Sequence, residues 1–291
     1  MILFATSFHE KMYNATGKDL LRSWLNHWSN GKMTVYAEGT DLDYVQEASD
    51  DRVNVVGIDD DPWLNAWLEE NRDNIPVELG GACTGEMSMW DRKSSLWARK
   101  TAAFQRAYAD AEHGDLVVWL DADVIITDDV PEDLLASVSR KRDIVYACSA
   151  SRKRKTGIES GVVILRKRPE VDAVMDRIRE KYDRMAKRWK ELPRHDDGYV
   201  LLVVLREMTQ GDFFANSHRL SSGARCFDMS SQNNSNPLTC CPLAPYMVHQ
   251  KGLHASLGTD GMNSAPDGND KKKNRTKAYN ETRRKARENN S

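Results

Sequence analysis

The fold of this chain is decided by one stretch, Val117-Val118-Trp119-Leu120-Asp121-Ala122-Asp123-Val124-Ile125-Ile126. An apolar run ends in two carboxylates that stand one residue apart, and the sequence then becomes apolar again. We expect Leu116–Leu120 to form a buried strand, because short apolar runs are typical of strands inside a parallel sheet. The carboxylates then emerge at the carboxyl end of that strand, where open α/β sheets bind their ligands.

Asp121 and Asp123 predict a site for a hard divalent cation. Carboxylate oxygens suit Mg²⁺ or Mn²⁺, which can in turn hold a diphosphate. Two carboxylates at the end of a buried strand are also costly without a cation nearby. In the alternative interpretation, Asp123 caps a turn and Asp121 pairs with a lysine.

The flanking sequence alternates between strand and helix patterns. Apolar runs rich in β-branched residues predict strands, and apolar spacing of three and four predicts helices. The predicted strands of the first half are 2–7, 33–37 and 53–58, and its helices are 19–28, 62–71 and 94–112. Such alternation requires crossover connections, so we predict an α/β fold with a mixed, mainly parallel sheet flanked by helices.

The second half continues the pattern less regularly. We predict helices over 131–138 and 169–191, a further helix capped by an aspartate after His195, and strands over 144–147, 161–165 and 246–248. The region from the end of that capped helix to about Pro245 is rich in turn-forming residues and is expected to be loop. Residues 258–291 lack apolar periodicity, so we expect one domain over 1–257 and a disordered polar tail over 258–291.

Two further groups carry chemistry. Lys100 lies on the otherwise apolar face of helix 94–112, and it either extends along that face to solvent or points into the crevice at the carboxyl end of the sheet. The segment His249-Gln250-Lys251-Gly252-Leu253-His254 follows a predicted strand. An imidazole can complete a Mn²⁺ site, and the ammonium of Lys251 can neutralise a diphosphate. His249 and His254 are the two candidate ligands.

The apolar strand with Asp-x-Asp, together with the late histidine, resembles the GT-A fold of nucleotide-sugar glycosyltransferases. Arg99-Lys100-x-x-Ala-Phe followed by Trp-Leu-Asp-Ala-Asp is similar to small cytoplasmic glycosyltransferases of bacteria, large DNA viruses and phages. The resemblance implies a hexosyl- or pentosyltransferase that binds Mn²⁺ or Mg²⁺. It also implies a nucleoside-diphosphate sugar donor, with a UDP-sugar favoured, and a glycan, protein or small-molecule acceptor.

The same resemblance implies roles for single residues. His249 becomes the third metal ligand beside Asp121 and Asp123. Lys100, Asp121 and Lys251 face the donor, and Glu159 binds sugar hydroxyls. Asp197 or Asp196 is the base that an inverting enzyme needs, although helix capping explains one of the two. From topology alone, Thr6 and Ser7 at the end of the first strand meet the nucleotide base or ribose.

Composition narrows the alternatives. The 291 residues carry a formal net charge of −2, which does not favour nucleic acid as a partner. No secretory signal and no transmembrane span is recognisable, so we expect a cytoplasmic protein, in the host cytoplasm if the source is viral. The five cysteines lack metal-type spacing and are expected to be reduced.

Two other functions remain open. One is a sugar-nucleotide or glycan-binding module with weak or no turnover. The other is a phosphohydrolase with an aspartate nucleophile, which is less favoured because Asp121-Ala122-Asp123 lies far into the chain and is followed by Val124-Ile125-Ile126.

Overall fold

The computed structural model describes residues 1–39, 41–75, 93–131, 133–149, 157–187, 194–213, 215–230 and 237–250. Except for Gln250, these residues belong to one unit of the chain, Met1–His249. The tail predicted over 258–291 lies outside the described residues.

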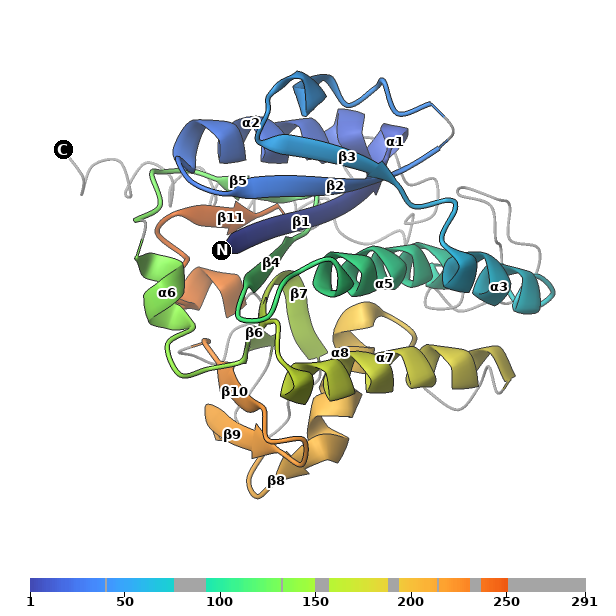
Figure 1. Ribbon diagram of the computed structural model, residues 1–291, viewed down its shortest axis with the longest axis vertical. Coiled ribbons are helices and arrows are strands. Elements are labelled where there is room, and N and C mark those ends of the chain that lie inside the picture. Colours follow the sequence, from blue (N-terminus) through green and yellow to red (C-terminus); the bar gives the residue numbers. More distant parts are fainter. Residues whose placement is uncertain are drawn as a thin grey trace, which may run out of the picture. The chain divides into compact units, whose positions relative to one another are not determined.

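A nine-stranded sheet forms the centre of this unit, in the order β3-β2-β1-β4-β7-β6-β10-β9-β8 (Figure 1). The strands are β1 (Ile2–His9), β2 (Lys32–Glu38), β3 (Val53–Gly57), β4 (Leu116–Leu120), β6 (Ile144–Ser149), β7 (Gly157–Arg166), β8 (Thr209–Gln210), β9 (Ser217–Leu220) and β10 (Arg225–Asp228). The pairs β1–β2, β1–β4, β2–β3 and β6–β10 are parallel, whereas β7 and β9 are antiparallel to their neighbours. The predicted mixed, mainly parallel sheet is therefore confirmed.

Helices cover both faces of the sheet. One face carries α3 (Pro62–Glu70), α5 (Ser94–Ala109), α7 (Pro169–Lys187) and α8 (Asp197–Met208), and the other carries α2 (Lys18–His27) and α6 (Leu134–Val138). All five residues of β4 are buried. Trp119 belongs to the core on the α5 side and Val118 to the core on the α2 side, as the two-residue period of a strand requires. The buried strand predicted over Leu116–Leu120 is therefore confirmed.

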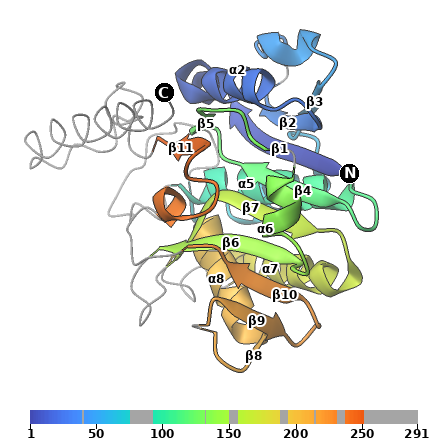
Figure 2. The same cartoon turned by 90° about the vertical axis from the view of Figure 1, so that its left-hand side faces the viewer.

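A small second sheet lies beside the first. β5 (Val124–Ile126) follows the two aspartates directly and pairs antiparallel with β11 (Met247–His249), with His249 opposite Val124 (Figure 2). Both strands contribute to the core on the α2 side. The pairing brings the end of the described chain next to Asp123.

The remaining elements are short. They are α1 (Glu10–Met12), the π-helix η1 (Tyr13–Gly17), and the 3₁₀-helices η2 (Gln46–Ser49) and η3 (Pro237–Cys240). α5 ends five residues before Gly114, whose φ of +95° is a left-handed conformation that favours glycine.

Two predictions about elements were wrong. β7 begins at Gly157 and not at residue 161, so Glu159 lies within a strand that pairs with β4 and β6. The region expected to be loop contains β8, β9 and β10, and β10 joins the main sheet. These strands have two to four residues each, which is too short for a period to show in the sequence.

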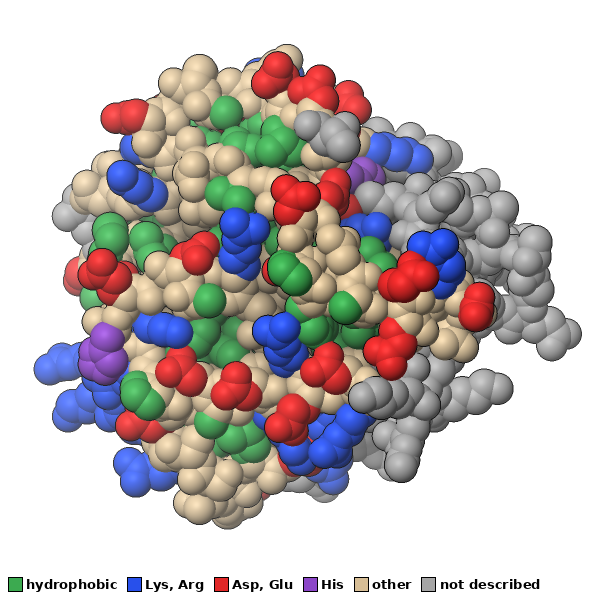
Figure 3. Space-filling model, turned by 45° about the vertical axis from the view of Figure 1, so that its right-hand side comes forward, with side chains coloured by type: hydrophobic (Ala, Val, Ile, Leu, Met, Phe, Trp, Pro, Cys, Tyr) green, Lys and Arg blue, Asp and Glu red, His purple; other side chains and the backbone are tan. Residues whose placement is uncertain are grey.

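The surface agrees with the near-neutral charge of the chain. On the face shown in Figure 3, acidic and basic side chains are interspersed. Among the described residues, none of the helices has both the length and the apolar character needed to cross a bilayer. Cys148, Cys226, Cys240 and Cys241 carry free thiols.

Candidate active site

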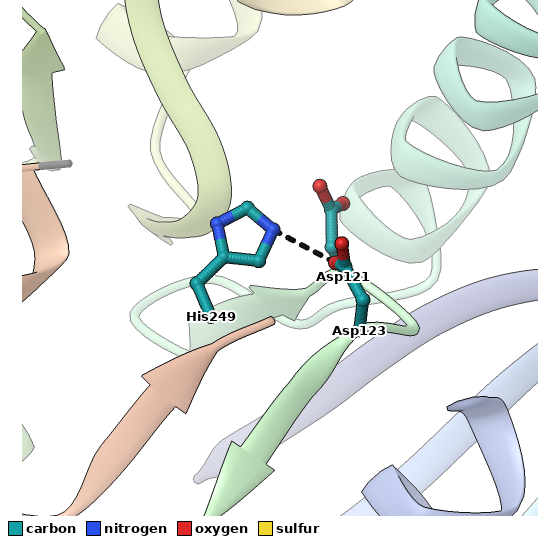
Figure 4. A group of neighbouring side chains, drawn as sticks. All are labelled: Asp121, Asp123 and His249. Atoms are coloured by element: carbon teal, nitrogen blue, oxygen red, sulfur yellow. Dashed lines mark hydrogen bonds and ion pairs between the residues drawn. The ribbon is translucent and has the colours of Figure 1, made fainter. Parts of the chain in front are cut away.

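The carboxyl end of β4 carries the two aspartates of the opening stretch. One ligand atom from each of Asp121, Asp123 and His249 lies within 4.8 Å of the others. Figure 4 shows the imidazole reaching from β11 toward the carboxylate of Asp123 at the start of β5. His249 Nε2 lies 2.8 Å from Asp123 Oδ1. The structure thus brings together the three residues that the sequence proposed as metal ligands.

Lys100 of α5 points into the same place. Its Nζ lies 2.6 Å from Asp121 Oδ1 and 2.7 Å from Asp197 Oδ2, and it donates a hydrogen bond of 3.0 Å to Ser160 Oγ. Trp119 Nε1 donates to the same oxygen of Asp121 at 2.8 Å. Of the two orientations expected for Lys100, the structure shows the one that points into the crevice. Asp121 pairs with this lysine, as the alternative interpretation of Asp121 predicted.

Glu159 of β7 completes the group on the far side of His249. Its Oε1 lies 3.2 Å from His249 Nδ1, and only 3% of the residue is exposed. We refer to Asp121, Asp123, Glu159 and Asp197, with Lys100 and His249, as the acidic corner. Four carboxylates meet one ammonium and one imidazole there, so the corner has excess negative charge.

Electrostatics in the corner follow from burial and crowding. Burial raises the pKa of Asp121, and the nearby Asp197 and Asp123 add to the rise, against the opposing effect of Lys100. Burial alone would lower the pKa of Lys100, but the carboxylates of Asp121 and Asp197 outweigh it and raise that pKa. A divalent cation would relieve the repulsion among these carboxylates.

The neighbouring residues Asp196 and Asp197 make different contacts. Asp196 precedes α8 and caps it, because its Oδ1 accepts a hydrogen bond of 3.0 Å from Tyr199 N. Its other oxygen accepts from Arg194 Nε at 2.8 Å, and burial raises its pKa. Asp197 is the one that contacts Lys100, so helix capping accounts for Asp196 and leaves Asp197 as the acidic-corner residue.

Two glycines allow the elements of the corner to approach one another. A Cβ on Gly161 would lie 2.8 Å from His249 Cε1, and a Cβ on Gly198 would lie 2.3 Å from Ile158 O. Gly161 therefore leaves the space that the imidazole occupies. Gly198 lets the first turn of α8 meet the backbone of β7, which brings Asp197 to Lys100.

A cleft of about 610 Å³ opens at the ends of β1 and β2. We call it the strand-end cleft; its walls include His9, Glu38, Tyr44, Asp59, Asn65 and Arg99. Arg99 Nε lies 3.1 Å from Glu38 Oε2. Burial raises the pKa of Glu38 to about 7, partly offset by Arg99. Because Arg99 and Lys100 are consecutive residues of α5, one helix contributes a cation to the cleft and another to the acidic corner.

Other predicted site residues are less exposed or lie elsewhere. Thr6 is fully buried, and its Oγ1 has no hydrogen-bond partner among the described residues. Ser7 is partly buried and, by alternation along β1, faces the side of the sheet that carries α5. Lys251 and the competing ligand His254 lie outside the described residues.

Comparisons with known proteins were made by sequence and by structure. No protein-family model matches the sequence, and no curated protein matches it. Solved structures that are similar to the chain include glycosyltransferases. An active-site mutant of the galactosyltransferase LgtC has 10% identity over 68% of each chain, with a TM-score of 0.44. Mouse xyloside xylosyltransferase 1 has 11% identity over 71% of this chain and 82% of its own, with a TM-score of 0.45. The glycosyltransferase GlyE of Streptococcus pneumoniae TIGR4 has 12% identity over 70% of this chain and 43% of its own, with a TM-score of 0.41.

Sequence reasoning missed several residues of the site. It did not identify the strand-end cleft, Glu38, or the contact of Glu159 with His249. The available signal for Glu159 was its place shortly before the apolar run 162–165, because a carboxylate drawn into a buried strand needs a partner. No local signal marks Glu38, since the walls of the cleft come together only in the folded chain.

Proposed function

We propose that this protein is a metal-dependent glycosyltransferase that moves a sugar from a nucleoside-diphosphate sugar to a hydroxyl acceptor. The observation that carries the proposal is the acidic corner, where Asp121, Asp123 and His249 converge at the carboxyl end of the central strand, beside Lys100. This edge of an open α/β sheet is where such folds bind ligands.

The residues of the corner fit a divalent cation. Two carboxylates and an imidazole are ligands that Mn²⁺ accepts readily, while Mg²⁺ prefers oxygen alone, so Mn²⁺ is the favoured ion. When bound, the cation would neutralise charge on the departing nucleoside diphosphate. Asp121, Asp123 and His249 would hold it.

The strand-end cleft is the place we propose for the nucleoside of the donor, with a UDP-sugar favoured. Its volume suits a small-molecule ligand, and the Glu38 carboxylate can accept hydrogen bonds from ribose hydroxyls or a base N–H. Thr6 and Ser7 lie on the strand that ends at this cleft. Their contact with the nucleotide remains a prediction.

Lys100 and Asp197 are the remaining polar pair of the corner. Lys100 would reach the donor phosphates or the sugar, and its ammonium would then leave Asp121 to the cation. If the reaction inverts the anomeric centre, the Asp197 carboxylate takes the proton of the acceptor hydroxyl. The acceptor oxygen bonds to the anomeric carbon as the bond between that carbon and the diphosphate oxygen breaks. Lys251 is a further proposed phosphate contact.

A thermal-shift screen of nucleotide sugars, with and without Mn²⁺, tests the proposal. A donor present at about a hundred times its Kd adds roughly 2.7 kcal/mol of stability. We expect one or a few nucleotide sugars to raise Tm only when Mn²⁺ is present, and the same compounds to be hydrolysed or used for transfer. Stabilisation without turnover across an acceptor panel would favour a binding module. Release of phosphate from simple monoesters would favour a phosphohydrolase.

A further inference from the structure

The imidazole of His249 lies between two carboxylates, one at each ring nitrogen. Asp123 Oδ1 is 2.8 Å from Nε2, and Glu159 Oε1 is 3.2 Å from Nδ1. The Nδ1 contact has the distance of an ion pair without the alignment of a hydrogen bond. Of these two carboxylates, only Asp123 belongs to the group of three that could hold a metal ion.

Glu159 is poorly placed to meet a sugar. It lies within β7, opposite Ala147 of β6, and only 3% of it is exposed. A carboxylate in such a position is costly unless a charged or polar group pairs with it. The imidazole of His249 supplies that group.

Gly161, two residues further along β7, shapes the space for the ring. The pairing of β6 with β7 shifts register in this part of the strand, and both Glu159 and Gly161 face His249. A Cβ at Gly161 would approach His249 Cε1 to 2.8 Å and Nδ1 to 2.9 Å. One strand thus provides both the space for the imidazole and the carboxylate at its Nδ1.

We propose that Glu159 is a positioning residue, which holds Nδ1 of His249 so that Nε2 ligates the cation. In metalloproteins a ligating histidine commonly donates its other N–H to a carboxylate, which fixes its tautomer and orientation. The inference rests on the metal site of the proposed function but does not depend on the sugar, the acceptor or the occurrence of turnover. It replaces the predicted contact of Glu159 with sugar hydroxyls.

Glu159→Gln tests the inference, because it keeps the size of the side chain and removes its charge. We expect the affinity for Mn²⁺ alone, measured by calorimetry, to fall about ten- to a hundredfold, the usual effect of losing such a partner. Glu47→Gln is the matched control. Glu47 is also buried, but its carboxylate contacts Tyr13 and Arg22, so this variant should bind Mn²⁺ as the unaltered protein does.

The outcomes separate the inference from the proposed function. A folded Glu159→Gln protein that binds Mn²⁺ within twofold of the unaltered protein overturns the inference, and a raised donor KM in that variant would restore the sugar contact. If the unaltered protein binds Mn²⁺ but transfers no sugar, the proposed function fails. In that case, a lower affinity of the Glu159→Gln variant for Mn²⁺ would still support the positioning role.

Two further measurements do not depend on the folding of Glu159→Gln. Gly161→Ala leaves Glu159 in place but fills the space of the ring, and we expect it also to weaken Mn²⁺ binding at least tenfold. In the unaltered protein loaded with diamagnetic Zn²⁺, ¹⁵N spectra of the histidines should show a protonated Nδ1 and a metal-bound Nε2 for His249. Ligation through Nδ1 would overturn the inference.

Discussion

The acidic corner and the strand-end cleft lie at the same edge of the sheet but are built differently. In the corner, side chains from the end of β4, from β7 and β11 and from α5 and α8 meet in largely buried contacts of 2.6–3.2 Å. The cleft is open, about 610 Å³ in volume, and lined by residues from the ends of β1 and β2, from helices and from loops. The difference suggests that the corner is preorganised for one small ion, while the cleft can accommodate a larger ligand.

The largest expected effect tests whether the two regions are separate. Asp123→Ala removes a proposed ligand and the partner of His249 Nε2, so we expect Mn²⁺ affinity to fall by more than about a hundredfold, because even indirect partners contribute ten- to a hundredfold. Asp59→Ala, which changes an aspartate of the cleft, should leave Mn²⁺ affinity within about twofold. Calorimetry with the metal alone measures both. An equal loss in both variants would show that the ion does not bind at the corner.

A second effect, on stability and not on affinity, is expected from Lys100, the cation of the corner. Lys100→Met leaves Asp121 and Asp197 without their ammonium, and removing one partner of a buried ion pair typically costs about 3 kcal/mol or more. Since Mn²⁺ can replace the lost charge, we expect the deficit in the free energy of unfolding to narrow when Mn²⁺ is added. Urea denaturation with and without Mn²⁺ measures this. A deficit that Mn²⁺ does not change would mean that Lys100 and the ion do not share Asp121.

The smallest effect concerns the cleft and its pH dependence. The pKa of Glu38 is raised from 4.5 to about 7, so folding favours its protonated form. Its contribution to stability is therefore fully present below pH 4.5 and is lost as the pH rises to about 7. Between pH 5.5 and 8.5 the unaltered protein should lose about 2 kcal/mol relative to Glu38→Gln, which does not titrate. Urea denaturation of both proteins over this pH range measures the difference. If the free energy of unfolding changes with pH equally in both, the pKa of Glu38 is not raised by burial.

The sequence predicted the corner better than the cleft, for a physical reason. An apolar run ending in Asp121 and Asp123 is a local pattern, and His249 follows a second apolar run. The resemblance to GT-A glycosyltransferases then implied that His249, with His254 as the competitor, joins the two aspartates. The apolar patterns of the predicted strands then place these residues at the carboxyl-end edge of the sheet. The cleft depends on where α3 and α5 pack, which helical spacing does not specify. The role of Glu159 was missed because β7 carries polar residues and a glycine where it passes the site, which hid the start of the strand.

The pairing of β5 with β11 has a consequence for how the site is assembled. Asp123 and His249 are separated by 126 residues, so their contact closes a long loop and comes late by the usual relation between contact order and folding. A nascent chain that has emerged as far as Asp228 already contains every strand of the main sheet, but it lacks β11. If His249 ligates the metal as proposed, it can do so only after every strand of the main sheet has been synthesised. Mn²⁺ affinity should accordingly distinguish completely folded molecules from molecules in which β11 has not yet paired with β5.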